Sequence, residues 1–336
     1  MTPLPTPSIR IVASEDPAAG PGALPAPGDV AGPGADAPSP PARPPGTPRY
    51  DLDVVVAGLR ASRDVTHNIR RGGRIRRAPS IGVLNGVVDE LTAALFPSHH
   101  GPGDLRPADF DAFVRGTLNG ALSVLEQEIL HGLDFKHDDR GSDAAREAEA
   151  LSITQAFSAA LSAVRSALVA DLGAFGGAAS AAAGLPERLL ADVGVGAIIG
   201  FRLAHVLDGL GAGLVARLVS AVARRRTGVD IHPAATIGSG FSIVGGQGIV
   251  VGEGTVLGSG VRLYGAVTLG AAEAAGRRSA GAPVIEDDVT IYPGATVLGP
   301  VTVGRGSVIG GGVWLTGDVP PRSRVVQAPP QATPRP

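Results

Sequence analysis

The chain has 336 residues, a formal net charge of −2 at pH 7 and no cysteine. This length suits two domains plus a tail, and the near-neutral charge gives no reason to expect binding to nucleic acid or to an anionic membrane. The lack of cysteine excludes disulfides, a thiolate nucleophile and a cysteine-ligated zinc site, and it fits a cytoplasmic protein. No charged region followed by an apolar run opens the chain, so no secretory signal is predicted.

The first part of the chain is predicted to lack a packed core. Residues 1–49 consist mostly of Pro, Ala and Gly and are expected to form a disordered tail, because they bury too little apolar surface to offset chain entropy. Residues 50–80 are interpreted as a basic linker. Within it, Asn68–Arg77 places five arginines around two glycines. A solvated basic segment is the plainer interpretation of this run, and a contact with an anion or a partner is the alternative.

Residues 81–226 are predicted to form a helical domain. Apolar residues recur at spacings of three and four, which predicts helices over 84–95, 110–129, 144–172 and 186–224, the last split near 209–213. The most apolar stretch, 189–207, contains Asp192, Arg202 and His205, and these charged or polar residues argue against a membrane span.

Residues 227–319 carry aliphatic side chains at a spacing of six, which predicts a parallel β-helix of hexapeptide repeats. A helix is excluded because its apolar face returns every 3.6 residues. Two interruptions break the period, one between Val244 and Val250 and a longer one from Gly270 to Val284. Glycines such as Gly238 are expected at corners. The predicted inward set is Ile231, Ile237, Ile243, Val251, Leu257, Leu263, Leu269, Ile285, Ile291, Val297, Val303, Ile309 and Leu315. Residues 320–336 are again rich in Pro and are predicted to be a loose tail.

Several sequence blocks, in one order, resemble bacterial serine O-acetyltransferases. In the solenoid they are Thr227–Gly238, Gly248–Glu253, Val267–Gly270 and Pro283–Val289; upstream they are Ala93–Pro97 and Gly200–His205. The resemblance covers about residues 81–326. It implies a left-handed β-helix that forms trimers, commonly dimers of trimers, with acetyl-CoA in the groove between adjacent solenoids.

The resemblance also implies a reaction, the transfer of acetyl from CoA to the hydroxyl of L-serine in cysteine biosynthesis. An alcohol is a poor nucleophile at neutral pH, so a base must remove its proton during the attack. In the family a histidine oriented by an aspartate is that base, and a second histidine comes from across the trimer interface. The positions that correspond to CoA contacts are Gly270, Ala271, Gly294 and Ala295.

The residues that would carry this chemistry are replaced. Val244 and Gly245 stand at the positions of the aspartate and the first histidine, while Gly281 and Ala282 stand at those of an arginine and the second histidine. The family's upstream aspartate falls within Ala179–Ala181. Because such groups act as a unit, their joint loss implies serine acetylation that is weak or absent, on a scaffold that keeps its CoA positions.

Few ionisable residues remain as substitutes. His232, the one histidine of the solenoid, is interpreted as a structural element of the first coil. Glu253 matches a family glutamate and is the leading candidate base, with a corner carboxylate that accepts backbone hydrogen bonds as the alternative. Further candidates, by location only, are Tyr264, Glu286, Asp287 and Tyr292.

Two functions therefore stay open. The first is an acetyl-CoA-dependent acyltransferase with weak or altered acceptor use, for instance with an amine. The second is a non-catalytic CoA-binding paralogue or regulatory subunit in mixed trimers. A metal-dependent hydratase on the same scaffold is set aside, since it needs several converging imidazoles, and no metal is expected. The family's partner complex with cysteine synthase uses a terminal isoleucine, whereas this sequence ends Thr333–Pro336, so no such complex is expected.

Overall fold

The structure, a computed structural model, describes residues 52–67, 77–136, 142–174, 184–274, 277–278 and 281–327. The predicted tail 1–49, most of the arginine run, residues 179–181 and the last nine residues lie outside the described residues. The chain divides into two units, Met1–Val65 and Thr66–Pro336, which are treated separately below.

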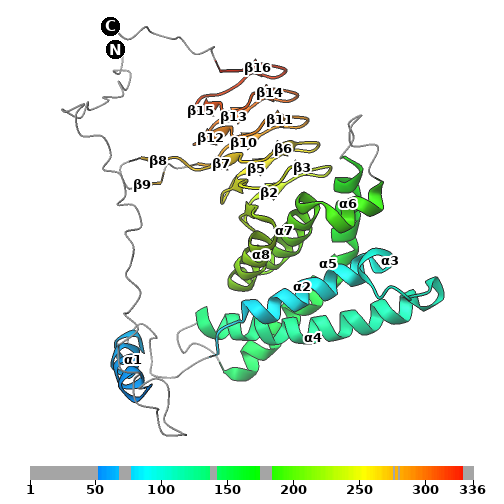
Figure 1. The fold of residues 1–336 in the computed structure, drawn as a ribbon, viewed down its shortest axis with the longest axis vertical. Helices are drawn as coiled ribbons and strands as arrows, with labels where there is room; N and C mark the ends of the chain where they lie inside the picture. The colour runs from blue at the N-terminus through cyan, green and yellow to red at the C-terminus, as the bar shows by residue number, and fades with distance from the viewer. Residues whose placement is uncertain are drawn as a thin grey trace, which may run out of the picture. The chain divides into compact units, whose positions relative to one another are not determined.

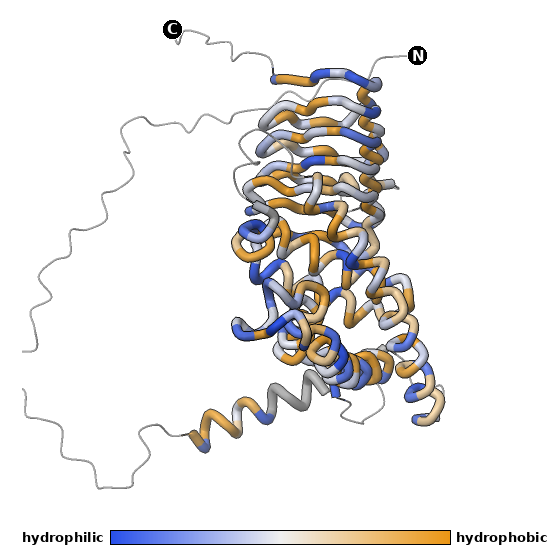
Figure 2. Tube along the Cα trace, turned by 90° about the vertical axis from the view of Figure 1, so that its right-hand side faces the viewer, coloured by the Kyte–Doolittle hydropathy of each residue, from blue (hydrophilic) through white to orange (hydrophobic). Residues whose placement is uncertain are grey.

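Helix α1 (Leu52–His67) lies in the segment that was interpreted as a basic linker. Leu52, Val55, Val56 and Leu59 follow the spacing of one helical face, and all four are exposed. Figure 2 shows the apolar colour along the first turns of this helix. No helix was predicted in this segment, although the 3.6-residue period of these residues favours one.

The second unit begins with the predicted helical domain (Figure 1). Its helices are α2 (Ile81–Leu95), α3 (Pro97–His100), the 3-10 turn η1 (Pro107–Asp109), α4 (Phe110–Lys136), α5 (Asp143–Gly173), α6 (Leu185–Ala191), α7 (Val193–Gly209) and α8 (Gly213–Thr227). The four predicted helices are confirmed, including the break near residue 210. A second break falls at Asp192, whose carboxylate accepts a hydrogen bond from the Gly194 N–H at 2.8 Å and starts α7.

Among the described helices, α5 alone is long and apolar enough, by length and composition, to cross a membrane. Its buried side chains, including Phe157, Leu161 and Leu168, instead belong to the same core as those of α2, α4 and α7. The buried apolar side chains of α5 therefore pack in the core of the helical domain.

A parallel β-solenoid with three faces follows the helices (Figure 1). Face A contains β1 (Asp230–Ile231), β4 (Val250–Val251), β7 (Thr268–Gly270), β12 (Thr296–Leu298) and β15 (Trp314–Leu315). Face B contains β2 (Thr236–Ile237), β5 (Val256–Leu257), β10 (Val284–Ile285) and β13 (Thr302–Val303). Face C contains β3 (Ser242–Val244), β6 (Arg262–Tyr264), β11 (Thr290–Ile291), β14 (Val308–Ile309) and β16 (Arg324–Val325). We name the edges between faces, in chain order, the A–B, B–C and C–A edges.

The predicted inward residues stack in register, one column on each face. Ile231 pairs with Val251 and Val251 with Leu269 on face A, for example. All of the predicted set is buried except Leu315 in the last coil, which is partly buried. A second buried row, two residues before each of these positions, was not predicted; it includes Phe241, Ile249, Val261, Val289 and Val301. Each hexapeptide thus sends two side chains inward.

The two interruptions fall at different edges. The first, between β3 and β4, widens the C–A edge of the lowest coil. The second, between β7 and β10, leaves the A–B edge and forms the antiparallel pair β8 (Glu273–Ala274) and β9 (Arg277–Arg278). At the regular corner Gly238, a Cβ would lie 2.7 Å from backbone atoms of Gly258 and Ser259, which confirms the corner role. The loose tail was placed too early, because β16 completes the last coil on face C.

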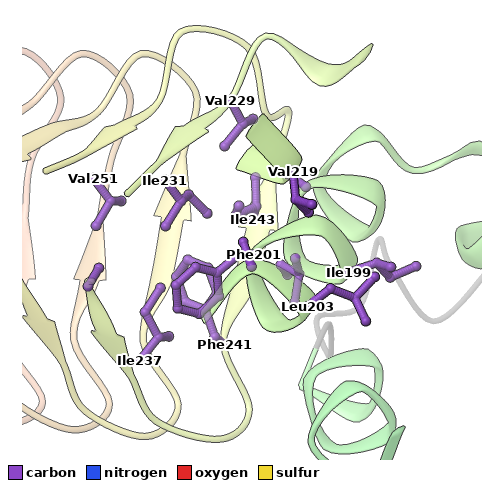
Figure 3. Close-up of a cluster of buried hydrophobic side chains, with 14 of the residues drawn as sticks. Ile199, Phe201, Leu203, Val219, Val229, Ile231, Ile237, Phe241, Ile243 and Val251 are labelled. Atoms are coloured by element: carbon purple, nitrogen blue, oxygen red, sulfur yellow. The ribbon is translucent and has the colours of Figure 1, made fainter. Parts of the chain in front are cut away.

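Helices α7 and α8 cover the open end of the solenoid, where Phe201 and Leu203 pack beside Phe241 and Ile243 (Figure 3). No coil precedes the first one, so backbone groups on its lower side need other partners.

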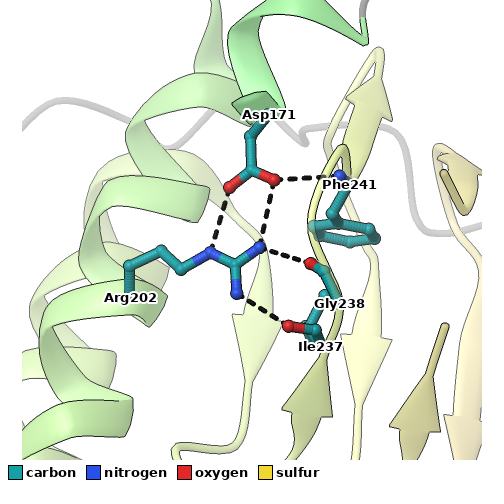
Figure 4. Close-up of polar contacts among 5 residues, drawn as sticks. All are labelled: Asp171, Arg202, Ile237, Gly238 and Phe241. Carbon is teal, nitrogen blue, oxygen red and sulfur yellow. Dashed lines mark hydrogen bonds and ion pairs between the residues drawn. The ribbon is translucent and has the colours of Figure 1, made fainter. Parts of the chain in front are cut away.

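Arg202 and Asp171 supply those partners (Figure 4). The Arg202 guanidinium donates to the carbonyl oxygens of Ile237 at 2.7 Å and Gly238 at 2.6 Å, and it forms a two-pronged ion pair with Asp171 at 3.0 Å. One Asp171 oxygen also accepts the Phe241 N–H at 2.9 Å. Both side chains are buried, so this cluster is a structural joint between helices and solenoid.

Candidate functional site

The two positions that the family resemblance assigns to histidines lie at different edges of the solenoid. Gly245 follows β3 at the C–A edge, and Ala282 precedes β10 at the A–B edge. Face A lies between these edges. One chain therefore does not bring the two positions together, and a site that used both would have to form between neighbouring chains.

Space remains beside Gly245. Its φ is +66°, and its carbonyl oxygen accepts a hydrogen bond from the Gln247 N–H at 2.7 Å, which closes a tight turn. Apart from Gly245 and its two chain neighbours, no heavy atom of the described residues lies within 4 Å of the place where a Cβ would stand. Val244, at the position of the family's aspartate, is 37% exposed. The turn thus presents an apolar, open surface where the family has an ionisable pair.

The segment of Gly281 and Ala282 has less free space beside it than Gly245 has. Gly281 has φ +124°, and a Cβ on it would lie 2.8 Å from the Cβ of Pro300. An arginine at position 281 would require the neighbouring coil to move. Ala282 lies beside the turn below it, since its Cβ is 3.7 Å from the Cβ position of Gly254. That turn also carries Glu253, an exposed residue at the same A–B edge as Ala282.

Tyr264 and Tyr292 share the C–A edge with Gly245. Val244 pairs in register with Tyr264, and the rings of Tyr264 and Tyr292 stack with centroids 4.9 Å apart at an angle of 14°. Tyr292 is 39% exposed. These three side chains form one column that runs up the C–A edge, and we call it the edge ladder.

Glu286 and Asp287 lie at the third edge, B–C, away from both replaced positions. A Glu286 oxygen accepts the Arg305 N–H at 2.7 Å, and Asp287 accepts the Ser259 N–H at 2.9 Å and a hydrogen bond from the Arg305 guanidinium at 2.8 Å. They line an open groove of about 630 Å³ together with Arg305 and Arg322. Their hydrogen bonds tie successive coils together, so their location does not support a role as the base.

Both histidines near the solenoid have structural partners. The backbone N–H of His232 donates to the Val251 carbonyl oxygen at 2.8 Å, and the ring Nδ1 of His232 accepts the Ala234 N–H at 3.1 Å. His205 Nδ1 lies 2.8 Å from the Pro233 carbonyl oxygen, so the hydrogen bond requires a proton on Nδ1. His205 lies on α7, whereas His232 lies between β1 and β2 at the A–B edge of the first coil. The use of His205 there was not predicted, because its partner lies 28 residues away in the sequence.

The four candidate CoA positions divide between the same two edges. Gly270 ends β7 and Ala271 follows it at the A–B edge, whereas Gly294 and Ala295 precede β12 at the C–A edge. The Ala295 side chain is fully buried. Its carbonyl oxygen accepts a hydrogen bond from the Thr268 N–H, and its N–H donates to the Tyr292 carbonyl oxygen. Ala295 therefore supports the backbone of this edge rather than its outer surface. The described residues contain no cluster of His, Asp and Glu able to hold a metal ion.

Comparison with known proteins agrees with this arrangement. Residues 282–317 match the family model "Bacterial transferase hexapeptide (six repeats)". The chain is 40% identical over 292 residues to a plasmid serine acetyltransferase of Synechococcus elongatus, a match that covers 83% of this chain and 91% of that protein. It is also 44% identical over 144 residues to the serine acetyltransferase of Bacillus subtilis, across 43% of this chain and 65% of the relative.

Solved structures give the same result. Serine acetyltransferase isoform 3 of Entamoeba histolytica, in complex with cysteine, superposes with a TM-score of 0.62 at 26% identity, and the match covers 78% of this chain and 87% of that one. Serine acetyltransferase 1 of the same organism, in complex with L-cysteine, also has a TM-score of 0.62, at 27% identity, over 76% of this chain and 90% of that one. With one relative matched at 40% identity over nine-tenths of its length, this chain belongs to the serine acetyltransferase family.

Proposed function

We propose that this chain binds acetyl-CoA on a serine acetyltransferase scaffold and acetylates L-serine poorly or not at all. The observation that carries the proposal is the lack of a free imidazole among the described residues of the C–A and A–B edges. Gly245 and Ala282 supply no proton acceptor, and Nδ1 of each nearby imidazole already has a partner: the Ala234 N–H for His232 and the Pro233 carbonyl oxygen for His205.

The distribution of the candidate positions supports a site shared between chains. Gly245 and Gly294 lie at the C–A edge, and Ala282 and Gly270 lie at the A–B edge. In a trimer of the kind that the family resemblance implies, the C–A edge of one chain would meet the A–B edge of the next. A CoA molecule between them would contact small residues from both chains.

The missing side chains determine the expected rate. A general base contributes a factor of about 10² to 10⁴. Here the base, its orienting carboxylate and the second histidine are all replaced, and groups that act as a unit do not compensate for one another. Glu253 and His232 are ionisable side chains at the A–B edge, and Nδ1 of His232 already accepts the Ala234 N–H. A serine hydroxyl would therefore reach the thioester without the imidazole that normally removes its proton.

The direct experiment combines two measurements on the purified chain. Titration with CoA should show saturable binding. Thiol release from acetyl-CoA should then be no faster with L-serine than without it. Serine-dependent turnover at the rate of an ordinary family member would refute the proposed loss of serine acetylation. Failure to bind CoA would refute the proposed CoA-binding site.

A second candidate function, a regulatory subunit in mixed trimers, is favoured by the placement of the replaced positions at both edges. A trimer has three interfaces, and each subunit takes part in two of them. One copy of this chain would therefore disable two of the three sites formed with active partners. Co-expression with an active homologue should lower the activity per active chain; activity that depends only on the amount of the homologue would contradict this role.

A further inference from the structure

The edge ladder has a chemistry that the proposed function does not use. Stacked coils of a β-solenoid repeat at the interstrand spacing of about 4.8 Å. The ring centroids of Tyr264 and Tyr292 are 4.9 Å apart and nearly parallel, so the coil spacing itself places the rings in a stack. Val244 continues the column below them, and apart from the chain neighbours of Gly245 no described heavy atom lies within 4 Å of the Cβ position at Gly245.

This surface suits a planar apolar group rather than serine. L-serine is small and zwitterionic, and it needs charged partners for both its ammonium and its carboxylate. The ladder offers a valine and two aromatic rings instead, with Tyr292 39% exposed. Aromatic rings gain about 0.5 to 1.5 kcal/mol from offset stacking beyond the area that they bury. A flat ring is therefore the ligand group that this edge recognises best.

The lost base points to the same class of molecule. The nitrogen of an aromatic amine is uncharged at neutral pH, because its lone pair is delocalised into the ring and binds a proton weakly. Such an amine needs no imidazole to remove a proton before it attacks. An edge without a base but with stacked rings is thus matched to an acceptor that is both planar and already a nucleophile.

We propose that the edge ladder binds planar aromatic amines and that these, rather than serine, are the acceptors of acetyl from CoA. The inference rests on the proposed CoA binding. In the reaction the amine nitrogen forms a bond to the thioester carbonyl carbon, and the carbon–sulfur bond breaks with its electron pair leaving on sulfur. The proton lost by nitrogen neutralises the thiolate, so the products are an N-acetyl aromatic amine and CoA.

The test uses the full chain with aniline as the probe. Cyclohexylamine, of similar size but neither flat nor uncharged at neutral pH, and L-serine serve as comparison compounds. Aniline should bind more tightly than cyclohexylamine and should accelerate thiol release from acetyl-CoA, with acetanilide detected by mass spectrometry. The variant Tyr292→Ala should weaken aniline binding about 2- to 12-fold, and Tyr292→Phe, which keeps the ring, should retain it.

Trp314→Ala is the matched control, because Trp314 is an exposed aromatic residue on face A and lies outside the ladder. It should leave aniline binding unchanged. Equal binding of aniline and cyclohexylamine, or equal loss in the Tyr292→Ala and Trp314→Ala variants, would overturn the assignment of the ladder. Binding of CoA and aniline without acetanilide would overturn the acceptor role. Absence of CoA binding would instead mark a failure of the proposed function.

Discussion

The junction below the first coil and the two edges that flank face A differ in their polar side chains. At the junction, Arg202 and Asp171 are buried and satisfy backbone groups of the first coil. At the edges, Gly245 and Ala282 occupy the positions that the family resemblance assigns to histidines. The chain thus keeps the polar groups that hold its fold, and under the proposed function it lacks those that would perform serine acetylation.

The largest expected effect is at the junction. Arg202→Met would leave Asp171 buried without its partner, and removal of one member of a buried ion pair costs about 3 to 5 kcal/mol. The free energy of unfolding from denaturant titration measures this loss. Arg305→Met is the matched control, because Arg305 pairs with Asp287 in an exposed position and should cost less than about 1 kcal/mol. Equal effects of the two variants would contradict a structural role specific to the junction.

The inward register of the solenoid predicts the next effect. Leu263→Ala removes a fully buried side chain of face C and should destabilise the chain by about 2 to 5 kcal/mol. Val256→Ala removes an outward side chain of face B and should change stability by about 0.5 kcal/mol. Denaturation of both variants checks the register, and a costlier Val256 variant would contradict it.

Corner geometry should give a smaller effect. In Gly238→Ala the new methyl group would press on the backbone of Gly258 and Ser259, and overpacking of this kind costs about 1 to 3 kcal/mol. Gly317→Ala is the control, since nothing described lies within 4 Å of its Cβ position. A shift in the midpoint of thermal unfolding for the first variant alone is expected. Comparable shifts in both would show that close coil approach is not the cause.

The smallest structural effect concerns the open turn at the C–A edge. Gly245→Ala meets no neighbouring atom, so its cost comes only from the positive φ, about 1 to 2 kcal/mol. Circular dichroism and denaturation should therefore show a folded, slightly less stable protein. Failure to fold would mean that the turn cannot accept any side chain and that the space beside it is not usable.

The fold was predictable because its signals are local and repeated. The six-residue period placed Leu257, Ile285 and Ile309 in the core without any knowledge of their partners. Helix α1 was missed because its few apolar residues precede a strongly basic run. The ion pair that binds the backbone of the first coil was not predicted for another reason. Arg202 and Asp171 are 31 residues apart, and no local sequence pattern indicates such a pair.

The site was predictable in part. Alignment of short motifs located the replaced positions, but only the coil arrangement shows that Gly245 and Ala282 occupy different edges. It also separates Glu286 and Asp287, at the B–C edge, from Tyr264 and Tyr292, at the C–A edge. Four residues that were equal candidates by sequence thus fall into two groups with different uses. The left-handed sense of the coil and the trimer stay predictions from the family resemblance.

The most direct measurement compares this chain with its own variant Gly245→His/Ala282→His, at saturating acetyl-CoA and L-serine, with O-acetylserine detected by mass spectrometry. We expect little or no product from the unchanged chain and a measurable increase when both imidazoles are restored. Production of O-acetylserine by the unchanged chain at the rate of an ordinary serine acetyltransferase, with no gain in the variant, would contradict the proposal that this chain lacks the proton acceptors for serine acetylation.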